Sequence, residues 1–188
     1  ATPATSAGGK YVFAYFTGNN TSEQKIRFAV SDDGYNFTAI NGNQPVVEQT
    51  TGTGCARDPY LFRGQDGYFY MVATDMDASL GWWDVNDAMT VWRSADLVNW
   101  SEESHISIKD VKNADGTPAL PANETVHCFW APQVIWDAST GKYMVYFSLS
   151  TSSFTGGSEQ KIYYMLTDIL EKQEINTYRK NERELLLS

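Results

Sequence analysis

The sequence predicts an all-β protein of the β-propeller type, in which four-stranded antiparallel sheets, called blades, are arranged as a ring. Segments of one pattern recur along the chain at a spacing of roughly 55–75 residues, which is typical of propeller blades. Aromatic residues make up 14% of the 188 residues, and flat rings pack well on pleated sheets. A plain β-sandwich is the alternative. The propeller is favoured because strands, turns and closing aromatic residues align together.

The repeated unit contains up to four strands, each rich in β-branched or aromatic residues. Its first shared strand is expected at residues 10–16, 67–73 and 142–148. Its second is expected at 25–32, 89–96 and 161–168. A polar turn and a short aromatic strand follow twice, at 33–37 and 97–100, and a leading strand precedes two copies, at 59–63 and 132–136.

These strands predict a partial propeller over residues 1–168, with blades at about 10–40, 57–101 and 130–168. Residues 101–126 are expected to form a loop. Residues 169–188 depart from the repeat, because they are charged, lack Gly and Pro and have a helical composition, so this tail is expected to be helical or non-native. Since a ring needs at least about four blades, it is expected to be completed by missing C-terminal blades or by self-association.

Composition excludes several classes of function. The net charge of −9 without a basic stripe argues against nucleic acid as a partner. No apolar run approaches the ~18 residues that a membrane span requires. The chain begins with small, turn-forming residues and no Met, which suggests a mature secreted or periplasmic protein after removal of a signal peptide.

The candidate catalytic stretch is residues 55–63, where Arg57 and Asp58 precede Pro59 at the start of an apolar strand. The leading strand of a blade lines the axial channel, so Asp58 is expected at the mouth of that channel. A carboxylate there is a candidate general base, which Arg57 would keep ionised. The alternative is an Asp-Pro turn with a solvated carboxylate.

Long loops between the first and second shared strands are expected on the same side as Asp58. The loop at 75–88 carries Asp75, Trp82 and Trp83, which could form one wall of a sugar pocket. The alternative is that one Trp is buried and the acidic residues are simply solvated. Cys55 and Cys128 occupy matching positions in neighbouring blades, as a disulfide or as two separate thiols. His105 and His127 are isolated, so no metal site is expected. No cofactor is expected either, and nothing in the sequence indicates a cation in the channel.

Four motifs together resemble glycoside hydrolase family 43: Arg57-Asp58-Pro59, Ala73-Thr74-Asp75, residues 94–100 and Trp130-Ala131-Pro132. That family contains arabinofuranosidases, arabinanases and xylosidases on five-bladed propellers. The resemblance covers about residues 10–168. It implies inverting hydrolysis by a general base Asp, a general acid Glu and a second Asp that orients the acid.

By this resemblance Asp58 is the general base, and Arg57, Asp75 and Trp130 line the substrate pocket. Gln133 stands where the family often has an acidic residue, at a non-catalytic position of the pocket. Neither the acid nor the orienting Asp has a motif in this chain. The sequence therefore predicts a hydrolase acting on arabinose- or xylose-containing oligosaccharides or polysaccharides, in an incomplete form. A non-catalytic carbohydrate-binding or interaction propeller is the alternative.

Overall fold

The computed structural model describes residues 11–81, 86–101, 103–152, 159–168 and 176–177, and these form an all-β protein. The first sheet contains β1 (Tyr11–Tyr15), β2 (Arg27–Ser31) and β3 (Thr38–Ala39). The second contains β4 (Ala56–Arg63), β5 (Phe69–Asp75), β6 (Ala88–Ser94) and β7 (Ser104–Ser107). The third contains β9 (Val126–Asp137), β10 (Lys142–Thr151), β11 (Lys161–Thr167), β12 (Asn176–Thr177) and β8 (Lys112–Asn113). We call these sheets blades 1, 2 and 3.

The connections add two short 3₁₀ helices, η1 (Asn41–Asn43) and η2 (Ile108–Asp110). Neighbouring strands within a blade are antiparallel, apart from the short parallel pair that β8 forms with β12. No helix in the described ranges is long and apolar enough to cross a membrane. Because the described residues form three sheets and only these two short helices, the all-β prediction is confirmed.

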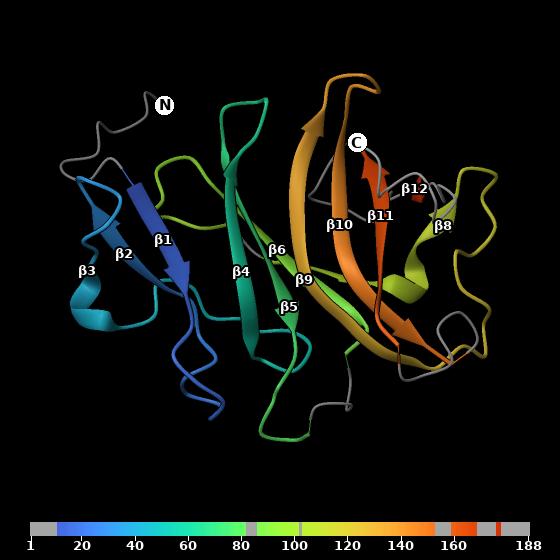
Figure 1. Cartoon of the computed structure of the whole chain (residues 1–188), viewed down its shortest axis with the longest axis horizontal. Coiled ribbons are helices and arrows are strands. Elements are labelled where there is room, and N and C mark those ends of the chain that lie inside the picture. The colour runs from blue at the N-terminus through green and yellow to red at the C-terminus, as the bar shows by residue number, and fades with distance from the viewer. Residues whose placement is uncertain (1–10, 82–85, 102, 153–158, 169–175, 178–188) are drawn as a thin grey trace.

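The blades pack face to face, and Figure 1 shows β4 of blade 2 between β1 of blade 1 and β9 of blade 3. Successive side chains of a strand point to opposite faces. Met71 and Ala73 of β5 accordingly pack against Phe28 of blade 1. Tyr70 and Val72 belong to the larger core that blade 2 shares with blade 3. Blade 3 contributes to this core, among others, Phe129, Val134, Val145, Phe147 and Leu149. Because both faces of blade 2 are buried, its strands read as continuous apolar runs.

The pairing register shows that the sequence alignment of the second strand of blade 2, β5, with that of blade 3, β10, is wrong by one residue. Arg57 pairs with Thr74 in blade 2, and Trp130 pairs with Ser148 in blade 3. Thr74 therefore corresponds to Ser148, whereas the alignment of residues 67–73 with 142–148 places it opposite Leu149. A slip of one residue exchanges the two faces of a strand. The apolar pattern could not detect this slip because both faces of these strands are apolar.

The polar turns expected within 33–37 and 97–100 are present, but the short aromatic strands expected there are not. The next strands begin later, at Thr38 in blade 1 and at Ser104 in blade 2. In blade 2, Ser94 Oγ accepts from Leu97 N at 2.9 Å, and Asp96 Oδ1 accepts from Asn99 N at 2.8 Å. The same bonds recur in blade 1 around Asp33. These hydrogen bonds, foremost those from Asn36 and Asn99, lower the pKa values of Asp33 and Asp96.

Residues 101–126 were expected to form a loop, but they contribute β7, η2 and β8. In the tail, Asn176–Thr177 forms β12, which pairs with β11 and β8, so the helical expectation is wrong for these two residues. The remaining tail residues lie outside the described ranges. Residues 101–126 thus contribute one strand to blade 2, β7, and one strand to blade 3, β8.

The two outer blades expose apolar side chains on the faces that point away from blade 2. On blade 1, Tyr11 and Phe13 are 51% and 52% exposed, and Phe13 also contacts the ring of Phe37. On blade 3, Ile135 and Ile162 are 46% and 57% exposed.

Candidate functional site

Asp58 lies on a β-bulge in β4, the first strand of blade 2. The register of β4 against β5 shifts between Arg57 and Tyr60, and Asp58 has a positive φ of 49°. Blade 3 repeats this geometry, because β9 also has a register shift there and Ala131 has a φ of 50°. The alignment of Asp58 with Ala131 is therefore confirmed by the backbone. Bulges re-aim side chains next to functional sites, and Asp tolerates the left-handed region better than most residues.

The Asp58 carboxylate is exposed, and it accepts a hydrogen bond on Oδ2 from Thr74 Oγ1 at 3.1 Å. Thr74 is fully buried in β5. Its hydroxyl oxygen also accepts from Ala131 N at 2.8 Å, so one side chain connects the bulges of blades 2 and 3. An exposed carboxylate on a fixed backbone can act as a general base towards a water molecule.

Arg57 is 7% exposed and points into the loop between β1 and β2. Its Nη1 donates to Asn19 Oδ1 at 2.9 Å and to Gln24 Oε1 at 3.0 Å, and its guanidinium lies 4.4 Å from the centre of the Phe16 ring. The structure thus shows Arg57 joining blade 1 to the start of β4. Its proposed contact with substrate stays a prediction.

Gln24 connects three parts of this region through its side-chain amide. Oε1 accepts from Arg57 Nη1 and from Ala78 N, at 3.0 and 2.9 Å. Nε2 donates to Asp77 Oδ1 at 2.9 Å and to Asn19 O at 3.0 Å. Both donors to Oε1 are N–H groups, so the orientation of the amide is determined, and its hydrogen-bonding capacity is fully used. Gln24 is 0% exposed, which makes each of these bonds costly to lose.

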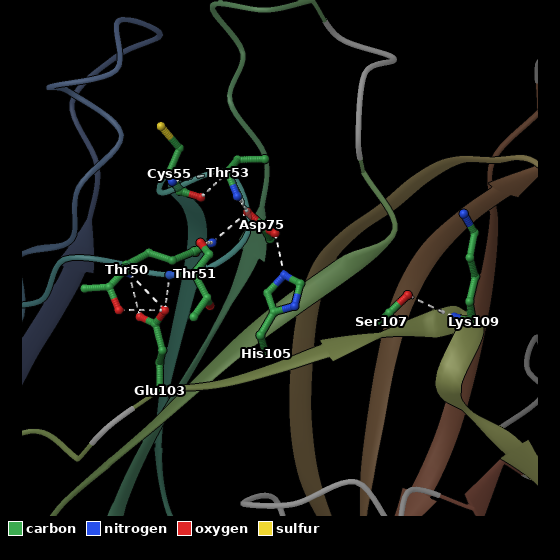
Figure 2. A network of polar contacts seen from close by, with 10 residues as sticks. Thr50, Thr51, Thr53, Cys55, Asp75, Glu103, His105, Ser107 and Lys109 are labelled. Carbon is green, nitrogen blue, oxygen red and sulfur yellow. Dashed lines mark hydrogen bonds and ion pairs between the residues drawn. The ribbon is translucent and has the colours of Figure 1, made fainter.

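The side chain of Asp75 is buried and contacts the segment that precedes β4 (Figure 2). Oδ1 accepts from Gln49 Nε2 at 2.6 Å and from Thr53 N at 2.9 Å, and Oδ2 lies 2.6 Å from His105 Nε2. Asp75 is 1% exposed, so a sugar could reach its carboxylate only by displacing these partners. The predicted role of Asp75 in the substrate pocket stays a prediction. The structure shows that its carboxylate binds Gln49, Thr53 and His105.

Glu103, just before β7, holds the same segment from outside (Figure 2). Its carboxylate accepts from the backbone N–H groups of Thr50 and Thr51 and from the Thr50 hydroxyl. Partial burial opposes ionisation of Glu103, but these hydrogen bonds outweigh burial and lower its pKa. Glu103 and His105 therefore clamp the segment that leads directly into β4 and Asp58.

The remaining predicted pocket residues are placed differently from one another. Trp130 is half-buried on β9, where its Nε1 donates to Asn86 Oδ1 at 3.1 Å, and Gln133 is exposed and accepts on Oε1 from the Tyr146 hydroxyl at 2.6 Å. Trp130 directly precedes Ala131, so it lies at the bulge that Thr74 joins to Asp58. Trp82 and Trp83 lie outside the described residues.

Cys55 and Cys128 are both free and buried, so the disulfide alternative is wrong in this structure. Burial raises the pKa of both thiols, for Cys128 to about 11. Thiols in this state are poor nucleophiles. Nor do the described residues bring together three His, Cys, Asp or Glu side chains that could hold a metal ion.

The sequence did not single out Thr74 or Gln24 as functional residues. Thr74 was visible within the Ala73-Thr74-Asp75 motif, although only the structure shows that its hydroxyl reaches Asp58. Gln24 gave no signal, because its side-chain partners other than Asn19 lie 33 to 54 positions away in the chain. The general acid is still unassigned.

Comparisons with known proteins agree with the all-β fold and identify a family. The family model described as "Probable glycosyl hydrolase domain", which is related to glycoside hydrolase family 43, matches residues 7–185. The match includes residues 169–185 of the tail. An alpha-L-arabinofuranosidase from Bifidobacterium longum subsp. longum is 27% identical over 147 residues, which are 73% of this chain and 13% of that protein.

Two solved structures share the fold. A glycosyl hydrolase from Bacteroides ovatus has a TM-score of 0.58 and 18% identity, over 96% of this chain and 48% of that one. A fructofuranosidase from Schwanniomyces occidentalis, complexed with fructose, has a TM-score of 0.55 and 20% identity, over 84% of this chain and 27% of that one. This chain thus spans less than half of the length of each of these three relatives.

Proposed function

This chain belongs to a family of glycosyl hydrolase domains related to glycoside hydrolase family 43, and on that premise we propose that it hydrolyses glycosidic bonds of arabinose- or xylose-containing oligosaccharides or polysaccharides. The observation that carries the proposal is the exposed carboxylate of Asp58, on a bulge of β4 and hydrogen-bonded to Thr74. The alpha-L-arabinofuranosidase relative supports arabinose as the first sugar to test.

In this proposal Asp58 acts as the general base of an inverting reaction. Its carboxylate takes a proton from a water molecule as the water oxygen forms a bond to the anomeric carbon. The bond from that carbon to the leaving-group oxygen breaks, and a separate carboxylic acid protonates the leaving group. Trp130, beside the second bulge, offers a flat apolar surface for a sugar ring.

We further propose that the complete ring has five blades, of which this chain supplies three. The exposed apolar faces of blades 1 and 3 support further blades on both sides. Additional blades would also supply the acid. Light scattering tests this proposal, because a monomer near 21.1 kDa argues against self-association and a larger particle supports it. Export to the periplasm or medium stays a prediction, which fractionation of the source cells would check.

The decisive experiment compares the chain with its Asp58→Asn variant on nitrophenyl arabinofuranoside and nitrophenyl xyloside. Loss of a general base is expected to reduce the rate by about 10²–10⁴-fold. Proton NMR of the first product should show the anomer opposite to that of the substrate. An Asp58→Asn variant with unchanged activity would refute the role of Asp58, and a retained anomer would refute the inverting mechanism.

A non-catalytic carbohydrate-binding domain is the second candidate. It is favoured by one observation, namely that the sequence carries no motif for the general acid or for the Asp that orients it. Calorimetric titration with arabino- and xylo-oligosaccharides distinguishes the two functions. Binding without product release supports the binding domain, whereas turnover by a homogeneous sample excludes it.

A further inference from the structure

We propose that Thr74 is a positioning residue that holds the Asp58 carboxylate and ties it to the neighbouring blade. This inference rests on the proposed role of Asp58 as general base. Thr74 touches neither substrate nor reacting atoms in this proposal. It acts through Asp58, by fixing one carboxylate oxygen and leaving the other for water.

The direction of the hydrogen bonds follows from the chemistry of the groups. The backbone N–H of Ala131 can only donate, so Thr74 Oγ1 accepts that bond, at 2.8 Å. The proton of the Thr74 hydroxyl is then free to be donated to Asp58 Oδ2, at 3.1 Å. Within the described residues this is the one hydrogen bond to the Asp58 carboxylate, which leaves Oδ1 without a protein partner.

Thr74 is well placed to fix a geometry. It is 0% exposed, so water does not compete for its hydroxyl. It lies in β5, the second strand of blade 2, between β4 and β6. Its branched Cβ restricts rotation about χ1. A hydrogen-bond donor held in this way restricts the rotation of an otherwise exposed carboxylate, as preorganised catalytic groups require.

Blade 3 shows that this arrangement is specific to Asp58 and not a general feature of the repeat. The bulge is the same, but Ala131 replaces Asp58 and Ser148 replaces Thr74 by strand pairing. The Ser148 hydroxyl lies 3.1 Å from Gln160 Oε1, to which it donates. A hydroxyl at this position thus finds a different partner where no carboxylate is present.

The test compares Thr74→Val, which removes the hydroxyl and keeps the branched shape, with Thr74→Ser, which keeps the hydroxyl. Thr90→Val is the matched control, because Thr90 is also 0% exposed, lies on the adjacent strand β6 and has a hydroxyl without a hydrogen-bonding partner among the described residues. In hydrogen-exchange NMR, the Ala131 amide should lose protection in Thr74→Val only. Unchanged protection of Ala131 in Thr74→Val would overturn the bridge.

A double-mutant cycle then isolates the bond to Asp58 without requiring activity. Chemical denaturation midpoints are measured for Thr74→Val, Asp58→Ala and the double variant. The shift caused by Thr74→Val should be smaller in the Asp58→Ala background, because the carboxylate partner is already absent. Additive shifts would overturn the proposed contact, and the loss of the Ala131 bond cancels in the comparison.

Kinetics on nitrophenyl arabinofuranoside complete the test. Thr74→Val should lower kcat on the order of 10- to 100-fold with little change in KM, because misplacement of a catalytic group can cost about 10²-fold. Thr74→Ser should restore most of kcat, and Thr90→Val should leave it unchanged. An unchanged kcat in Thr74→Val would overturn the positioning role. Absence of turnover in the unmodified chain would instead count against the proposed function, while the exchange and denaturation data still decide the bridge.

Discussion

Gly52 gives the sharpest test of the clamp that holds the segment before β4. Its φ is +57°, and a Cβ built on it would overlap Asp75 Oδ2 and lie 2.6 Å from His105 Nε2. Gly52→Ala therefore combines two costs. A left-handed residue with a Cβ costs about 1–2 kcal/mol, and overpacking of a tight site adds about 1–3 kcal/mol.

Gly42 separates the two costs, because its φ of +58° is almost the same and a Cβ there would meet nothing within 4 Å. Gly42→Ala should lose only the backbone contribution. The free energy of unfolding, measured by guanidinium denaturation, should therefore fall by about 1–3 kcal/mol more in Gly52→Ala than in Gly42→Ala. Equal losses in the two variants would refute the tight packing of Gly52 against the Asp75–His105 pair.

Three further predictions concern protonation, thiols and turn geometry. Hydrogen bonds in the folded state lower the Glu103 pKa below its ordinary value of 4.5, so this contribution to stability is complete above about pH 4.5 and is lost as pH falls through the lower folded value. The stability difference between the chain and Glu103→Gln, measured by denaturation at several pH values, should shrink on acidification, and a constant difference would contradict this account. Cys55 and Cys128 should resist a thiol reagent in the folded state and both react after unfolding without reductant, whereas no reaction after unfolding would indicate a disulfide. Leu97 has a φ of +64° where blade 1 has Gly34 at +77°, so Leu97→Gly should raise the free energy of unfolding by up to about 1 kcal/mol, and a loss of stability would contradict the proposed strain.

Features encoded over a few neighbouring residues were predictable from the sequence. The Ser-Asp-Asn turns around Asp33 and Asp96 bond within three positions of themselves, so their pattern appears directly in the sequence. The strands of blades 2 and 3 were visible as apolar runs bounded by turns. The matching positions of Asp58 and Ala131 were also correct, because each precedes a proline in the same short motif.

Other features failed because they depend on contacts between blades. Trp100 suggested a closing strand, but its ring packs against Phe28 of blade 1, with the ring centroids 6.0 Å apart. The fourth strand of blade 2 begins only at Ser104. Large aromatic residues are common both in strands and at interfaces between blades, so the sequence could not show which of these two positions Trp100 occupies.

The candidate site shows the same division between backbone and side chain. Two bulges with φ values of 49° and 50° show that the repeat supplies one backbone geometry to neighbouring blades. Chemistry then depends on which side chain occupies it, a carboxylate at Asp58 or a methyl group at Ala131. Thr74 connects these positions by bonds to residues 16 and 57 places away in the chain. Because one hydroxyl serves both bulges, the placement of Asp58 depends on the contact between blades 2 and 3, and a change that separates these blades should alter the position of the Asp58 carboxylate before it unfolds either sheet.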